Sequence, residues 1–275
     1  MVTQALTRPT APATQTKTRT ATAPALAVAI GRAVPAALTV GVVAAQIAYP
    51  LVTGGARAAL TISTVVAFFC ACVLHALATR GPGWTARWVA VAGGTGLLVE
   101  VLATRSGVPF GSYEYSDALG PTLLGVPAVI PLAWTMMSYP ALLAARRVTG
   151  RRWGQVLVGA VALAAWDVFL DPQMAAEGYW RWAPSGPAFA GIPLVNFAGW
   201  LVTATAMMAL LSALVPRDHP AGDDAIPLAL YLWTYAGSVL ANAVFFTRPA
   251  VALAGGLAMG VPVFLLVRAF RRGTP

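Results

Sequence analysis

Charged residues are scarce in this chain, and their scarcity limits the class of protein it can be. Of its 275 residues, 10% are charged and 58% are hydrophobic, whereas a soluble domain has about a quarter charged residues. This composition excludes a soluble globular domain and predicts an integral membrane protein. The net charge of +9 is spread between apolar segments, without a basic stripe interleaved with aromatic residues. We therefore expect no nucleic-acid partner.

Cysteine and histidine are also rare. Cys70 and Cys72 are two residues apart in an apolar run, so on a helix they point to different faces. Neither a disulfide nor a metal pair is expected from them. His75 and His219 have no clustered partners, so the sequence predicts no metal site. The glycines of 93–96 do not follow a strand and are no dinucleotide fingerprint, and we expect no cofactor.

Long apolar segments make up most of the remaining chain. Residues 1–24 have too little apolar surface to fold and lack a cleavable signal pattern, which predicts a disordered cytoplasmic tail. Residues 25–270 are predicted to form one polytopic transmembrane domain, all-α, with eight spans of about 20 residues. The spans are 25–48, 58–78, 85–103, 122–144, 154–171, 190–214, 226–247 and 250–268. The last two are separated only by Thr247-Arg248-Pro249, so seven spans is the alternative.

The distribution of basic residues predicts the orientation. With the N-terminus inside, fourteen basic residues lie in inner segments and four in outer loops. Cytoplasmic loops of membrane proteins carry the excess of Lys and Arg. The bias therefore predicts a multi-pass protein of the cell membrane with both termini in the cytoplasm.

Two stretches repeat one pattern 66 residues apart. Gly-Pro-x3-Gly-Val-Pro-x-Val-x4-Trp ends at Trp134, and the same spacing, with Ile for the first Val, ends at Trp200. Tyr113 and Tyr179 share this register upstream. Matches at one fixed offset indicate an internal duplication, with spans three and four repeated as spans five and six. The predicted topology places both loops, and the polar residues beside them, toward the outer side.

Three carboxylates lie within apolar spans: Glu100 near the end of the third, and Asp167 and Asp171 near the end of the fifth. An ionised group at mid-bilayer costs about 2.5–3.5 kcal/mol, so these acids need an explanation. A structural explanation is pairing with Arg105 and Arg181, or capping of loop amides. A functional explanation is that Asp167 and Asp171, four residues apart, share a helix face and repel each other when both are ionised. One of them would keep a proton and is a candidate general acid.

Aromatic residues crowd the outer loops. They are Phe110, Tyr113, Tyr115, Tyr179, Trp180, Trp182 and Phe189. An interfacial belt would explain them, but aromatic faces beside buried acids also stabilise a cation. Asn196 opens the sixth span at a similar depth, where it either orients a water or a carboxylate or forms an interhelical hydrogen bond.

At these residues the chain resembles the carotenoid biosynthesis protein family, which includes carotenoid hydratases and the bisanhydrobacterioruberin hydratases. The motifs that carry the resemblance are Pro109-Phe110-Gly111-Ser112-Tyr113-Glu114-Tyr115, Gly125-Val126-Pro127, Asp171-Pro172, Gly178-Tyr179-Trp180-Arg181-Trp182 and Gly191-Ile192-Pro193-x2-Asn196-Phe197-x-Gly199-Trp200. The resemblance covers roughly residues 25–270. It implies a membrane enzyme that adds water across the terminal C1′=C2′ bond of an acyclic (ψ) carotenoid end group, giving a tertiary alcohol.

The chemistry of that reaction assigns roles to the candidate residues. Asp167 is expected to donate the proton, with Asp171 or Glu100 coupled to it, and Asn196 and Glu114 to orient the attacking water. The expected pocket residues are Phe110, Tyr113, Tyr115, Tyr179, Trp180 and Trp182. The expected partners are a carotenoid dissolved in the bilayer, water, and other enzymes of carotenoid biosynthesis.

Two other functions share these features. A lycopene-type cyclase begins with the same protonation, but an internal double bond captures the cation. A proton-coupled lipid transporter also uses intramembrane acids and repeated halves. Here the acids lie near one face without a relay continuing inward, which favours the enzyme. A structural scaffold for other pigment enzymes would leave the acids unexplained.

Overall fold

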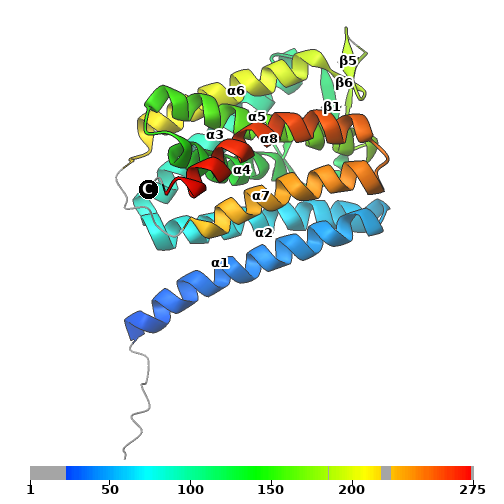
Figure 1. The fold of residues 1–275 in the computed structure, drawn as a ribbon. Helices are drawn as coiled ribbons and strands as arrows, with labels where there is room; N and C mark the ends of the chain where they lie inside the picture. Colours follow the sequence, from blue (N-terminus) through cyan, green and yellow to red (C-terminus); the bar gives the residue numbers. More distant parts are fainter. Residues whose placement is uncertain (1–22, 185, 218–223, 274–275) are drawn as a thin grey trace, which may run out of the picture.

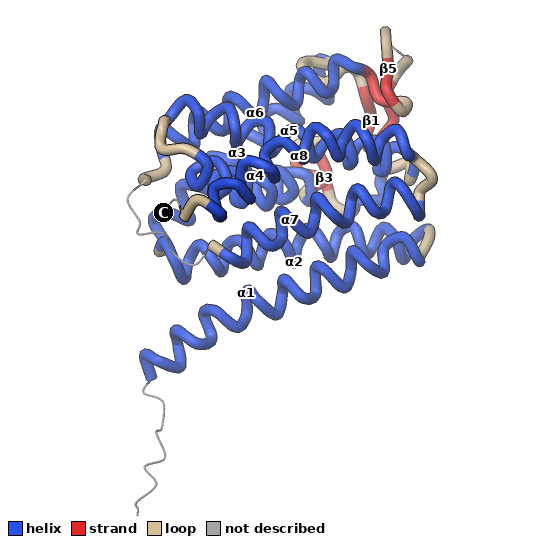
Figure 2. The backbone as a smooth tube through the Cα atoms, viewed as in Figure 1, coloured by secondary structure: helices blue, strands red, loops and turns tan. Residues whose placement is uncertain are grey.

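Eight long helices make up most of the described chain, which comprises residues 23–184, 186–217 and 224–273 of a computed structural model. They pack side by side as a bundle (Figures 1 and 2). The helices are α1 (Ala23–Ala48), α2 (Gly54–Arg80), α3 (Pro82–Ser106), α4 (Val129–Val148), α5 (Arg152–Ala176), α6 (Leu194–Leu214), α7 (Ala225–Leu240) and α8 (Pro249–Arg271). The all-helical fold predicted from the sequence is confirmed. The predicted N-terminal tail and His219 lie outside the described residues, apart from residues 23 and 24, which begin α1.

Seven of these helices are long and apolar enough to cross a membrane, and together they make this a multi-pass membrane protein. The exception is α4, whose residues 134–145 are all buried. Since neighbouring helices cover α4, polar residues such as Thr135 and Ser138 do not meet lipid there. Its lower hydropathy therefore reflects its position inside the bundle.

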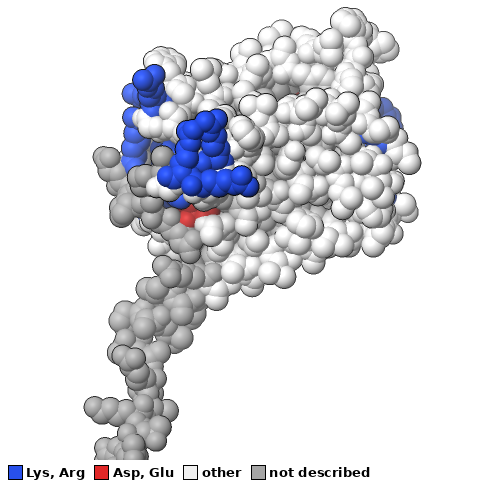
Figure 3. Space-filling model, viewed as in Figure 1, with Lys and Arg blue, Asp and Glu red and all other residues white. Residues whose placement is uncertain are grey.

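Basic side chains gather at one end of the bundle. On the face shown in Figure 3 most of them lie near the C-terminus, a few lie at the opposite end, and the middle of that face carries none. The last turn of α8 contributes Arg268 and Arg271 to this end of the bundle. The cytoplasmic location of this end stays a prediction.

Short strands cap the opposite end of the bundle (Figure 1). Strands β1 (Tyr113–Tyr115) and β4 (Trp180–Trp182) pair antiparallel, with Glu114 opposite Arg181. Strands β2 (Thr122–Leu123) and β3 (Val126–Pro127) form one hairpin, and β5 (Ala188–Phe189) and β6 (Ile192–Pro193) form another. The sequence prediction included no strands. It therefore counted the hairpin residues as parts of the following spans, and two predicted spans begin too early. The spans predicted from residues 122 and 190 begin as helices at Val129 and Leu194.

The two hairpins have the same turn. In each, two consecutive residues of positive φ connect the strands: Leu124-Gly125 (56° and 89°) and Ala190-Gly191 (51° and 83°). A two-residue turn with both φ values positive is the type I′ hairpin, which favours glycine. The repeated motif thus builds the same local structure twice, although the duplication itself stays a prediction.

Close helix packing holds the segments around the acids. A Cβ added to Gly96 on α3 would lie 2.8 Å from Trp134 Cβ on α4. A Cβ on Gly199 of α6 would lie 2.5 Å from the Pro109 carbonyl oxygen. These two glycines therefore let α3 approach α4, and let α6 approach the loop that carries Phe110.

Candidate active site

The three acids predicted from the sequence are buried in the interior. Glu100 is 4% exposed, Asp171 3% and Asp167 0%. Neither Arg105 nor Arg181 pairs with them, since the ion pairs in the described part of the chain are Arg57–Glu177 and Arg80–Asp224. The structural explanation by pairing with arginine is therefore wrong, and neutral donors hold these acids.

Glu100 accepts hydrogen bonds from three aromatic side chains. The Tyr113 and Tyr115 hydroxyls donate to Oε2, the second at 2.7 Å, and Trp134 Nε1 donates to Oε1 at 2.9 Å. Tyr113 and Tyr115 are two apart on β1, so both point to one face of the strand. Burial and the neighbouring Glu100 raise the pKa of both phenols above their ordinary value, so both remain donors.

Asp167 and Asp171 meet at Asn196 on the neighbouring helix. Asn196 Nδ2 donates to Asp167 Oδ2 at 2.9 Å and also to Asp171 Oδ2. The two carboxyl groups therefore share one donor and lie close together. Within the described residues, Asp167 Oδ1 has no donor. Two buried carboxyl groups that share one donor repel each other when both are ionised, and a proton on one of them removes that repulsion.

Aromatic rings fill the space between the acids. Trp134 and Trp200, the tryptophans that end the repeated motifs, stack with centroids 3.9 Å apart and planes 16° apart. Phe110 stacks 6.3 Å from Trp134, and Trp166 meets Trp200 edge-on at 6.3 Å. Trp182 lies 5.6 Å from Tyr113. A cation formed here would lie among ring faces, which attract it.

A small cavity of about 30 Å³ lies between the acids and these rings. Most of the predicted site residues line it: Glu100, Phe110, Tyr113, Tyr115, Asp171, Trp180, Trp182 and Asn196. A water needs about 10–15 Å³ of such space and two to four polar partners. Two acids and an amide provide such partners, so the cavity has the size and polarity for one or two waters.

Three predicted site residues lie elsewhere. Asp167 touches the cavity only through Asp171 and Asn196. Glu114 is exposed on β1, on the strand face opposite its neighbours Tyr113 and Tyr115. Tyr179 is buried, but its hydroxyl lies 3.5 Å from Thr61 and outside this cavity.

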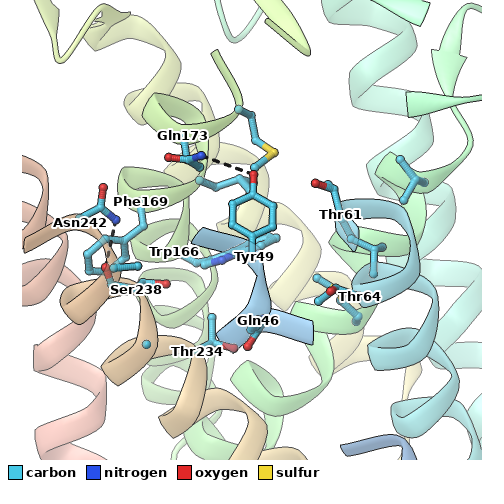
Figure 4. A pocket seen from close by; sticks show the side chains of 18 of the residues that line it. Gln46, Tyr49, Thr61, Thr64, Trp166, Phe169, Gln173, Thr234, Ser238 and Asn242 are labelled. Atoms are coloured by element: carbon cyan, nitrogen blue, oxygen red, sulfur yellow. Dashed lines mark hydrogen bonds between the residues drawn. The ribbon is translucent and has the colours of Figure 1, made fainter. Parts of the chain in front are cut away.

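A larger chamber of about 200 Å³ lies next to this cavity. Figure 4 shows part of its wall. The residues are Gln46 of α1 and Tyr49 just after it, Thr61 and Thr64 of α2, Trp166, Phe169 and Gln173 of α5, Thr234 and Ser238 of α7, and Asn242 of the π-helical turn Ala241–Phe245 that follows α7. Sequence reasoning missed this chamber, because its lining is ordinary apolar residues with scattered hydroxyls and amides. Asn242, a buried amide in an apolar segment, was the one available signal. No cluster of three metal-binding side chains occurs among the described residues.

Fold and site together define a multi-pass helical membrane protein with a buried carboxyl site next to an apolar chamber. The sequence profile of the carotenoid biosynthesis protein family matches residues 57–262. This chain belongs to that family, which confirms the resemblance seen in its motifs.

A curated relative gives a more specific comparison. The bisanhydrobacterioruberin hydratase of Haloarcula japonica is 32% identical over 117 residues. The alignment spans 41% of this chain and only 39% of the relative's length. No solved structure matches the chain.

Proposed function

We propose that the protein is a carotenoid hydratase that adds water across the terminal C1′=C2′ bond of an acyclic end group. The observation that carries the proposal is a water-sized cavity lined by Asp171, Glu100 and Asn196 beside stacked aromatic rings. Membership of the carotenoid biosynthesis family and a relative named as a hydratase support it. The cell membrane, where a carotenoid dissolves, is the proposed location.

The proton comes from the Asp167–Asp171 pair. The two buried carboxyl groups share the Asn196 amide and would repel each other if both were ionised, so one of them keeps a proton. Asp171 is the member that lines the cavity. We therefore assign delivery of the proton to Asp171 and make Asp167 its positioning partner. This differs from the sequence-based expectation that Asp167 is itself the donor. The proton adds to C2′, and the π electrons that form the new C–H bond leave a tertiary cation at C1′.

Glu100 and the aromatic rings stabilise that cation. Three donors hold the Glu100 carboxylate in place, so its charge needs no reorganisation when the cation forms. The faces of Trp134 and Trp200 add cation–π attraction. A water held between Asn196 and the acids then attacks C1′, and its released proton returns to the aspartate pair.

Expression in a lycopene-producing bacterium tests this function. Wild type should give 1′-hydroxy carotenoid, which is heavier than lycopene by one water, and Asp171→Asn should reduce its formation by about 100-fold or more. Asp171→Asn keeps the size of the side chain and an oxygen that accepts hydrogen bonds, so the variant should fold. Total pigment content and protein level in the cells serve as controls for substrate supply and folding. A product of unchanged mass would identify a cyclase, and unchanged lycopene in every strain would refute the proposal.

A further inference from the structure

The large chamber and the acid cavity are lined by different but neighbouring faces of α5. Trp166, Phe169, Leu170 and Gln173 face the chamber at the spacing of one helix stripe. Asp171 faces the acid cavity. An apolar space and a reactive one therefore lie next to each other beside α5.

The two spaces share a thin partition. Ile130, Ala133, Leu170 and Trp180 line both of them. The acid cavity has the volume of one or two waters, so a branched hydrocarbon cannot occupy it without displacing this partition. The chamber, at about 200 Å³, is the neighbouring space from which an end group can reach Asp171.

The chamber is closed toward the end that carries the strands. Gln173 Nε2 donates to the Tyr49 hydroxyl at 3.4 Å, and Arg248 Nη1 donates to Gln173 Oε1 at 2.6 Å. Arg57 and Glu177 pair beside them. This network joins α1, α2, α5 and the segment before α8 above the chamber. A hydrophobic ligand entering from this end would have to break it.

The wall formed by α7 is the weakest barrier. There α7 and the π-helical turn that follows it, Ala241–Phe245, present Gly237, Ser238 and Ala241, which are small and half-exposed. Gln46 of α1 lines the same side. Few residues of α1 are buried from Ala33 onward, and the helix lies at the rim of the bundle (Figure 1). We call this side of the chamber, between the small side chains of α7 and the peripheral α1, the slit.

From these contacts we propose that the chamber binds the polyene stretch next to the reacting end group, and that the slit between α1 and α7 admits it from the bilayer. The inference rests on the proposed function for its ligand class, a linear conjugated terpenoid. Pockets for drug-sized ligands measure about 300–1,000 Å³. At about 200 Å³ the chamber holds only the terminal segment, and the far end of the polyene stays in lipid.

A leucine at Gly237 tests the slit. A Cβ there would meet only the Trp233 ring, at 3.8 Å, so the larger side chain extends into the opening without a backbone clash. Gly94→Leu on α3 is the matched control, because Gly94 is helical and exposed and has no atoms within 4 Å of an added Cβ. Both changes raise helix propensity by a similar amount. Ser238→Leu is a second variant of the same wall, to be used if Gly237→Leu fails to fold.

The proteins are purified in detergent from lycopene-producing cells. Bound pigment per protein and its induced circular dichroism in the visible band report binding, and pigment mass reports hydration. We expect Gly237→Leu to bind at least about 10-fold less pigment, whereas Gly94→Leu equals wild type. Asp171→Asn should keep the pigment and lose hydration.

The two readouts separate the two ideas. If wild type binds lycopene and Gly237→Leu does not, but wild type forms no hydrated product, the chamber assignment stands and the proposed function fails. If Gly237→Leu, or Ser238→Leu in its place, binds as much pigment as wild type, the slit is refuted. Wild type that binds no pigment, or that carries a phospholipid acyl chain in place of pigment, refutes the chamber as the polyene site.

Discussion

The acids of this site differ in how many donors each receives. Glu100 has three donors from rigid aromatic side chains, whereas Asp167 and Asp171 share the single amide of Asn196. A carboxylate with many donors suits the role of a fixed negative charge, and a pair that holds one proton suits proton transfer. The proposed roles of Glu100 and of the aspartate pair therefore follow from their different hydrogen-bond partners.

Removing a donor from Glu100 should slow hydration. Tyr115→Phe deletes one hydrogen bond to a buried carboxylate, which costs about 1.5–3 kcal/mol and corresponds to a loss of about 10- to 100-fold in rate. Initial rates with lycopene measure it. Tyr179→Phe is the matched control, because its hydroxyl makes only a 3.5 Å contact with Thr61. Equal effects of the two changes would argue against a role for the Glu100 contacts.

The raised pKa values of Tyr113 and Tyr115 lead us to predict that the stability of the protein depends on pH. Burial raises the pKa of Tyr113 and Tyr115 above the unfolded value of about 10. Above pH 10 the folded protein therefore binds more protons than the unfolded chain, so the free energy of unfolding falls as pH rises further. Melting temperatures in detergent should be steady up to about pH 9 and fall above about pH 10, less steeply for Tyr113→Phe. An identical slope in the variant would contradict this.

At the scale of elements, the repeated hairpins depend on their glycines. Gly125→Ala puts a Cβ on a residue with φ of 89° and should lower the free energy of unfolding by about 1 kcal/mol, although the space around it is open. Gly191→Ala should cost a similar amount. Gly94→Ala, in an exposed helical position, should instead stabilise by up to about 1 kcal/mol. Thermal unfolding measures all three, and a neutral Gly125→Ala would refute the strained turn.

Apolar segment lengths predicted the helices well, because a span must cover the bilayer with hydrophobic residues. The segment predicted at 58–78 is the helix Gly54–Arg80, and that predicted at 250–268 is Pro249–Arg271. The prediction failed where apolar residues continue into a hairpin, as at Thr122–Pro127. Hydrophobicity does not distinguish a short strand pair from the first turns of a helix.

At the scale of the whole molecule, the acid site was predictable and the chamber was not. Carboxylates in apolar spans stand out in a sequence, and the loops that repeat around Trp134 and Trp200 indicated where they meet. The chamber is formed by residues from five helices whose composition is typical of any helix interior. Which of these residues leave space between them depends on packing, which one-dimensional patterns do not contain.

The size of the chamber predicts tolerance of substrate length. Because the chamber holds only the segment beside the end group, shorter and longer acyclic carotenoids with the same terminus should be hydrated at rates within a few-fold of one another. Initial rates with purified protein and a matched pair of acyclic carotenoids measure this. Loss of activity on the shorter carotenoid would show that the protein also binds the far end of its substrate.

Isotope incorporation tests most directly the claim that the aspartate pair protonates a carotenoid end group and water captures the cation. Purified protein is given lycopene in heavy-oxygen water, and separately in deuterium oxide, and the product is analysed by mass spectrometry. The account predicts one heavy oxygen on C1′ and one deuterium on C2′, with formation of both reduced by about 100-fold or more in Asp171→Asn. An isomer of lycopene without heavy oxygen, or full incorporation by Asp171→Asn, would contradict it.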